Sequence, residues 1–255
     1  MMYMKKIHSR DPSTNTKKDY DFLDNLQNYF TESKGSLPEK LQNFPKYAPR
    51  QDMTNLLARY EIFKKVHEVH GSVIECGVKL GGGLMTWAHF SSILEPVNYQ
   101  RQIIGFDTFT GFPGISNKDK KSISKFAKKG GYASHAYDDL LNCVKLYDSN
   151  RFIDHIPKIK LVKGDAVKTI PKFVKDNPHL VISLLNLDFD LFEPTKVAIE
   201  TFVPRMPKGS IIVFDEINNE SWPGETLAVF ETIGINNLKI QRIGFGDVIS
   251  YAILE

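Results

Sequence analysis

The stretch 73-VIECGVKLGGGLMTWAHF-90 decides the fold class of this 255-residue chain. An apolar run leads to Glu75 and Gly77, three consecutive glycines follow at 81–83, and a helical pattern then begins. Glycines at such a junction permit unusual backbone angles and close approach by another group. In doubly wound α/β folds, a ligand binds at this junction, beyond the carboxyl end of the first strand. The stretch therefore predicts the first strand and the ligand loop of such a fold.

Further apolar runs alternate with helical patterns along the chain. The strand patterns lie at 103–107, 158–164, 180–188 and 210–216, and the helical patterns lie around 83–95, 166–175, 194–203 and 223–233. Apolar strands that alternate with helices predict a mostly parallel sheet with helices on both faces. The last two strand patterns, LKIQRI and DVISYAILE, are joined by a GFG turn that is too short for a parallel crossover, so one strand should run antiparallel.

The regions outside this alternation define the expected domain organisation. Residues 1–51 are polar and rich in proline, which indicates a loosely structured N-terminal arm with one short helix near residues 19–30. A helix over 52–69 then leads into the α/β domain, which spans 52–255. A basic, polar insertion interrupts the domain at 114–150. The arm is expected to serve as a lid or as a contact in a homo-oligomer.

Composition excludes several classes of function. The net charge of +3 comes from interspersed basic and acidic residues, which gives no reason to expect nucleic acid as a partner. There is no run of about 18 or more apolar residues to cross a membrane, and the first residues are too polar for a signal peptide. Cys76 and Cys143 are far apart and are expected to be packing residues. We therefore expect a cytoplasmic protein with a small-molecule ligand.

The glycine-rich loop differs from a dinucleotide-binding loop. Its pattern places Glu75 and Gly77 before Gly81 and Gly82, where a nicotinamide cofactor would require G-x-G-x-x-G. An acid at this place favours a cationic ligand without phosphate, such as S-adenosylmethionine. The alternative is that the glycines merely allow tight packing of the strand against the helix. Asp107, which ends the second strand, is a candidate for binding ribose hydroxyls.

Carboxylates also follow three later strands. Asp165 opens a helix, so it could contact the adenine or serve only as an N-cap. Asp188 in 187-LDFDLFEPT-195, and Asp215 with Glu216 in 213-VFDEINNESWPGET-226, lie at the ends of strongly apolar strands. If those strands are neighbours, the charges would repel, and a hard cation such as Mg²⁺ would relieve the repulsion. The alternative is a set of helix caps and salt bridges.

Together these motifs carry a family resemblance. The ordered set ECGVKLGGG, GFDTFTGFP, LNLDFDLFEPT and IIVFDE resembles the macrocin O-methyltransferase family from about residue 52 to 235. The resemblance implies a Rossmann-like class I methyltransferase with a seven-stranded sheet whose last strand is antiparallel. It also implies S-adenosylmethionine and a divalent metal as cofactors. The sequence departs from the family in having Glu216 where a second Asp is commoner.

The resemblance assigns roles to residues of this sequence. The metal ligands would be Asp188, Asp215 and Glu216. The cofactor would contact Glu75, Gly77, Gly81, Gly82, Asp107, Thr108, Asp165, Ala166 and Asp188.

The expected reaction is methylation of a sugar hydroxyl in a natural-product or glycan precursor. Because an alcohol is a poor nucleophile near pH 7, a base must take its proton; Asp188 is the first candidate, and His135 in the insertion is the second. A catechol-like acceptor would use the same metal chemistry. An NAD-dependent sugar oxidoreductase or epimerase, or an inactive module that binds a nucleotide or sugar, are alternatives from other classes.

The insertion carries six lysines in 118-KDKKSISKFAKK-129. As a mobile cover they could attract the phosphates of a nucleotide-linked sugar, and the plainer alternative is a solvated helix face.

Overall fold

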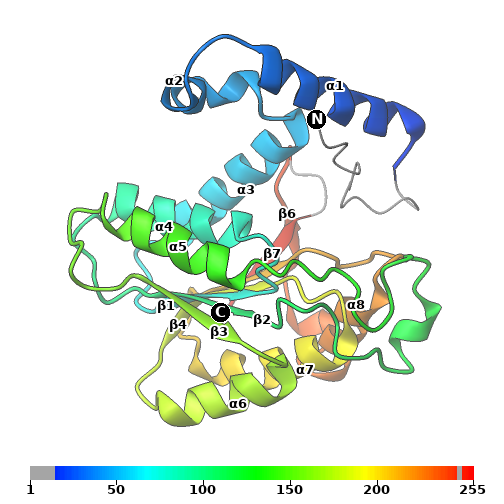
Figure 1. Ribbon diagram of the computed structural model, residues 1–255. Helices are drawn as coiled ribbons and strands as arrows, with labels where there is room; N and C mark the ends of the chain where they lie inside the picture. Colours follow the sequence, from blue (N-terminus) through cyan, green and yellow to red (C-terminus); the bar gives the residue numbers. More distant parts are fainter. Residues whose placement is uncertain (1–14, 246–248) are drawn as a thin grey trace.

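A seven-stranded sheet forms the centre of the fold (Figure 1). The structure is a computed structural model that describes residues 15–245 and 249–255. The strand order is β3-β2-β1-β4-β5-β7-β6. β1 to β5 pair in parallel, whereas β7 is antiparallel to both β5 and β6, which confirms the expected antiparallel strand. The strands are β1 (Ser72–Cys76), β2 (Ile103–Asp107), β3 (Ile159–Lys163), β4 (Ile182–Leu187), β5 (Ile211–Phe214), β6 (Gln241–Arg242) and β7 (Ser250–Ile253).

Six helices cover the two faces of the sheet. α3 (Arg50–Val66), α4 (Gly82–Leu94) and α5 (Tyr137–Asp148) lie on one face, and α6 (Ala166–Asp176), α7 (Phe192–Phe202) and α8 (Pro223–Glu231) lie on the other (Figure 1). Two apolar clusters, one on each side of the sheet, form the core. Every residue of β1 and β4 is buried, which is why these strands are mostly apolar and do not alternate between apolar and polar residues.

The order of the strands creates a switch point between β1 and β4. The chain leaves β1 for β2 on one side and later returns to β4 on the other, and ligands of such folds bind beyond the strand ends at this point. The two strand ends approach each other closely there. A Cβ on Gly77, which has a φ of +90°, would lie 1.9 Å from the Asp188 carbonyl oxygen. Only glycine fits this position.

The N-terminal arm is more ordered than the proline-rich sequence predicts. Its described part forms α1 (Lys17–Glu32), α2 (Leu37–Gln42) and a 3-10 turn (Phe44–Lys46). Capping boxes start both helices, with Thr16 paired to Asp19 and Ser36 paired to Glu39. α1 covers the helix expected near residues 19–30, whereas α2 was not expected. Neither helix buries a residue, and both lie beyond α3, away from the sheet (Figure 1). The first 14 residues of the arm lie outside the described residues.

The insertion predicted at 114–150 also needs correction. Its second half is α5, which forms the crossover from β2 to β3, and its lysine-rich segment is no helix but a loop with one 3-10 turn (Asp119–Lys121). Ser116, Ser122 and Ser124 accept hydrogen bonds from backbone N–H groups two residues further along, which favours turns over a helix.

Three smaller features complete the described chain. Two further 3-10 turns lie at Val203–Arg205 and Ile235–Asn237. The predicted turn between the last two strands falls partly on 246–248, outside the described residues. Among the helices of residues 15–245 and 249–255, none combines the length and apolar character that crossing a membrane requires.

Candidate active site

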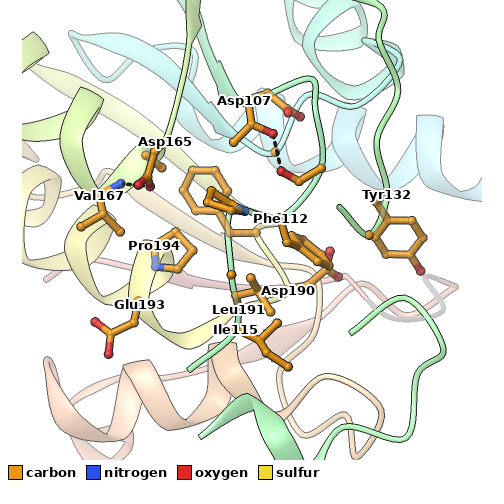
Figure 2. Close-up of a pocket in the computed structure, with 18 of the residues that line it drawn as sticks. Asp107, Phe112, Ile115, Tyr132, Asp165, Val167, Asp190, Leu191, Glu193 and Pro194 are labelled. Carbon is orange, nitrogen blue, oxygen red and sulfur yellow. Dashed lines mark hydrogen bonds between the residues drawn. The ribbon is translucent and has the colours of Figure 1, made fainter. Parts of the chain in front are cut away.

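A cavity of about 630 Å³ opens beyond the carboxyl ends of the parallel strands (Figure 2). Its walls come from the strand ends, from the loop between β2 and α5, and from the first turns of α6 and α7. In Figure 2, Asp165 and Val167 lie on one side and Tyr132 lies on the opposite side. Of the predicted site residues, Gly77, Asp107, Thr108, Asp165, Ala166, Asp188, Asp215 and Glu216 line the cavity.

Asp107 joins two of the loops that line the cavity. One of its carboxylate oxygens accepts the backbone N–H groups of Val78 and Lys79, at 2.8 and 2.7 Å, and the other accepts Phe109 N–H at 2.6 Å. The end of β2 thereby fixes the turn that follows β1. Carboxylates that accept several backbone N–H groups are held in one orientation, so Asp107 presents a defined edge to the cavity.

Asp165 combines both interpretations of its position. Its side chain accepts Val167 N–H at 3.1 Å, so it is the N-cap of α6, and it also lines the cavity together with Ala166. The capping role and a ligand-binding role are therefore compatible.

The structure places the other members of the glycine-rich loop outside the cavity lining. Glu75 is 2% exposed, and its carboxylate accepts the Trp87 indole N–H at 2.7 Å. Burial raises the pKa of Glu75 to about 7. Gly81 has a φ of +89° and faces Leu140, whereas an added Cβ on Gly82 would meet nothing within 4 Å. The loop is thus shaped from beneath by a buried carboxylate.

The carboxylates at the ends of β4 and β5 meet in the cavity, as the sequence predicts. Burial and the neighbouring charge of Asp215 raise the pKa of Asp188 well above its ordinary value. Burial and Asp215 likewise raise the pKa of Glu216, to about 7, while burial raises that of Asp215. These shifts record how unfavourable several negative charges are in one enclosed place.

Four further charged residues belong to this cluster and were missed. Asp190 lines the cavity with a φ of +61°, and Glu225 is fully buried with one carboxylate oxygen that has no hydrogen-bond partner. Arg59 and Lys79 supply positive charge. Arg59 partly offsets the rise that burial causes in the pKa of Asp188 and Asp215, and Lys79 does the same for Asp190. The motif LDFDLF contains Asp190, but nothing local distinguishes Glu225, Arg59 or Lys79.

The donor set suits a hard divalent cation. Asp188, Asp190, Asp215 and Glu216 offer only carboxylate oxygens. Burial, and for all but Asp215 the charge of neighbouring carboxylates, raises their pKa values, and a cation between them would offset both effects. Within residues 15–245 and 249–255, no three metal-binding side chains are already gathered around one point. The chemistry of these side chains therefore suits a metal ion. Binding one would require the side chains to move closer to one another.

A cover of residues 111–132 closes one side of the cavity. Phe112 and Tyr132 line the cavity and pack on Trp222, with ring centroids 5.8 and 5.6 Å from it. Trp222 is 4% exposed, so it supports the cover from behind. Five of the six lysines are exposed, and Lys118 is half-buried. His135 is exposed and is not among the residues that line the cavity.

Comparison with known proteins identifies the family. The profile of the macrocin O-methyltransferase (TylF) family matches residues 48–234, which is most of the chain. The chain belongs to the macrocin O-methyltransferase family. It is therefore an O-methyltransferase, and the family expected from the motifs is confirmed. No curated protein matches the chain at a significant level.

Solved structures agree with the family and the fold. The crystal structure of CalS11, a calicheamicin methyltransferase, is 31% identical with a TM-score of 0.89, over 98% of this chain and 99% of that chain. An apo structure of CalS11, described as a TDP-rhamnose 3′-O-methyltransferase, is 31% identical with a TM-score of 0.80, over 94% and 95% of the two chains. The O-methyltransferase NovP is 17% identical with a TM-score of 0.64, over 79% of this chain and 80% of that chain, which supports the fold alone. The class I methyltransferase fold is thus confirmed.

Proposed function

We propose that this macrocin-family enzyme transfers a methyl group from S-adenosylmethionine to a hydroxyl of a sugar, with a divalent cation bound beside the acceptor. One observation carries the proposal: the cluster of carboxylates lines the same cavity as Asp107 and Asp165. The similarity to CalS11 along 98% of the chain supports a sugar as the acceptor.

The donor would occupy the side of the cavity formed by the ends of β1 to β3. Asp107 would accept hydrogen bonds from the ribose hydroxyls, as acids at this strand end do in nucleoside-binding folds. Asp165 and Ala166 would border the adenine, and the backbone around Gly77 would border the amino-acid end. Glu75 would act indirectly, because it lies beneath the loop and is bonded to Trp87.

The acceptor would occupy the side formed by β4, β5 and the cover. Asp188, Asp215 and Glu216 would hold the cation, and Phe112 and Tyr132 offer aromatic faces to a sugar ring. When bound, a divalent cation lowers the pKa of a hydroxyl next to it and favours its ionised form.

The transfer of the methyl group requires one base that takes the hydroxyl proton. The acceptor oxygen forms a bond to the methyl carbon as the bond from that carbon to the sulfonium sulfur breaks, and the hydroxyl proton passes to a carboxylate. We propose Asp188 as this base because it lines the cavity at the end of β4, whereas His135 is exposed. The products are a methyl ether, S-adenosylhomocysteine and a proton.

The test is an acceptor screen read by mass spectrometry. The enzyme is incubated with S-adenosylmethionine, Mg²⁺ and, in separate reactions, TDP-rhamnose, other nucleotide-linked sugars, simple glycosides and a catechol. We expect a methylated sugar and S-adenosylhomocysteine in equal amounts. If only the catechol is methylated, the acceptor is an aromatic hydroxyl and not a sugar. If calorimetry shows binding of NAD and none of S-adenosylmethionine, the proposed methyl donor is wrong.

The metal requirement is tested in a separate experiment. Excess chelator and Asp215→Asn should each abolish turnover, whereas Asp176→Asn, which alters an exposed carboxylate paired with Lys172, should have no effect. Full activity in chelator would remove the cation from the proposal and leave the donor and acceptor sites to be judged by the screen.

A further inference from the structure

Asp119 is a buried acid in the most lysine-rich segment of the chain. It is 2% exposed, although Lys118, Lys120 and Lys121 surround it in sequence. One carboxylate oxygen accepts the backbone N–H and the hydroxyl of Ser116, at 3.0 and 2.6 Å. The other oxygen points out of the cover and accepts Phe192 N–H at 2.9 Å. Phe192 is the first residue of α7, so Asp119 satisfies a free N–H of that helix from another segment.

The first turn of α8 meets Asp119 at the same point. A Cβ on Gly224 would lie 2.5 Å from the Asp119 carboxylate, 2.5 Å from Phe192 nitrogen and 2.8 Å from the Asp190 carbonyl oxygen. Three segments far apart in sequence therefore converge here: the cover, the loop between β4 and α7, and the start of α8. The contact is too tight for any side chain on Gly224.

Two other contacts fasten the cover along the same line. The Ser122 hydroxyl donates to the Ser221 carbonyl oxygen. Lys118 forms an ion pair with Glu231 at the end of α8, and its ammonium group lies 4.1 Å from the centre of the Phe192 ring. Lys118 and Asp119 each contact both helices, and of the two Asp119 is the buried one.

Two carboxylates of the site depend on the elements that Asp119 joins. Asp190 lies two residues before Phe192 and holds a left-handed conformation with a φ of +61°. Glu225 follows Gly224, and its carboxylate accepts Glu216 N–H at 2.9 Å. A movement of either helix start would therefore move a carboxylate that lines the cavity.

We infer that Asp119 is a positioning residue that couples closure of the cover to the placement of Asp190 and Glu216. The cover brings Phe112, Ile115 and Tyr132 to the cavity, and the same hydrogen bond to Phe192 fixes the carboxylate side. The effect on catalysis rests on the proposed function, whereas the structural coupling does not.

Hydrogen–deuterium exchange on the full chain without substrate tests the coupling directly. In Asp119→Ala we expect faster exchange in three places: the cover, residues 190–195 and residues 215–219. Asp119→Asn should fall between wild type and Asp119→Ala, because an amide oxygen still accepts Phe192 N–H. Lys129→Ala, an exposed change in the same cover, should match wild type. Faster exchange confined to the cover would overturn the inference.

Kinetics with the acceptor found by the screen give a second readout. Asp119→Ala should raise the acceptor KM by roughly ten- to a hundredfold, the equivalent of one or two lost hydrogen bonds to a charged group. The dissociation constant of S-adenosylhomocysteine should change less than about threefold, because the donor side is built on β1 to β3. If Asp119→Ala does not fold, Ser122→Ala should show the same pattern more weakly.

The outcomes of the two experiments are distinguishable. An unchanged acceptor KM in Asp119→Ala and Ser122→Ala would contradict the inference. If wild type methylates no sugar at all, the proposed function fails while the exchange experiment still decides the coupling.

Discussion

Gly82 and Gly83 are adjacent residues with opposite tolerance for a side chain. A Cβ on Gly83 would lie 2.0 Å from a Glu75 carboxylate oxygen, and that buried carboxylate is held by Trp87. We expect Gly83→Ala to lower the free energy of unfolding by about 2–3 kcal/mol, as overpacking does elsewhere. Urea denaturation measures this, and Gly82→Ala is the matched control.

The control has a definite expectation of its own. Gly82 has open space around it and begins α4, so alanine should leave stability unchanged or raise it by about 0.5–1 kcal/mol. Equal denaturation midpoints for the two variants would show that Glu75 moves aside freely.

Glu75 should make stability depend on pH. Burial raises its pKa in the folded protein from 4.5 to about 7, so between these two pH values the folded state keeps a proton that the unfolded state has lost. The stability that this group contributes is therefore fully present below about pH 4.5. It falls by about 1.4 kcal/mol for each pH unit as the pH rises from there to 7.

Urea midpoints of wild type and Glu75→Gln across this range isolate the effect. Glutamine still accepts the Trp87 indole N–H but does not ionise, so the variant should lose less stability than wild type as the pH rises. Parallel curves for the two proteins would assign the pH dependence to the other carboxylates.

At the scale of elements, Arg101 ties the strand starts together at the end of the sheet opposite the cavity. It is 3% exposed and donates to Gly71 O at 2.9 Å, to His67 O at 2.7 Å and to Val69 O at 3.0 Å, while pairing with Glu95 at 2.6 Å. These bonds join the end of α3 and the entry to β1 to the segment before β2.

Loss of Arg101 should destabilise the fold without touching the site. We expect Arg101→Met to cost about 3–5 kcal/mol, the range for breaking a buried ion pair. Lys172→Ala, which breaks an exposed pair with Asp176, should cost no more than about 0.5 kcal/mol. Thermal or urea denaturation checks both, and a loss below about 1 kcal/mol for Arg101→Met would show that water replaces its bonds.

Helices and strands were predicted correctly where the apolar pattern was strong, and they were missed where most of the residues are polar. The parallel strands were predicted because β1 and β4 are buried on both faces and contain few polar residues. α5 was missed because its buried residues, Leu140 and Tyr147, are separated by a mostly polar surface within a segment interpreted as an insertion. In the arm, α1 was expected near residues 19–30, whereas the short α2 was missed because it buries no residue and spans only six residues.

At the scale of the whole molecule, the arm and the sheet domain should be separable. Because α1 and α2 bury no residue, a chain that begins at Ala48 should keep the urea midpoint of the full chain. A clear fall in the midpoint would show that the arm contributes to the core. Light scattering on both proteins then tests whether the arm forms the expected oligomer contact. If it does, deletion of the arm would lower the mass of the particle by more than the mass of the deleted residues.

The sequence by itself determined the sheet, its antiparallel strand, and the gathering of Asp188, Asp215 and Glu216, because apolar runs mark strands and parallel strands end at one edge. Only the tertiary structure decided that Glu75 lies beneath its loop, that Glu225 holds Glu216, and that Asp119 joins the cover to α7. The physical reason is distance along the chain: Asp119 and Phe192 are 73 residues apart, and a buried hydrogen bond between them depends on how loops meet rather than on any local pattern.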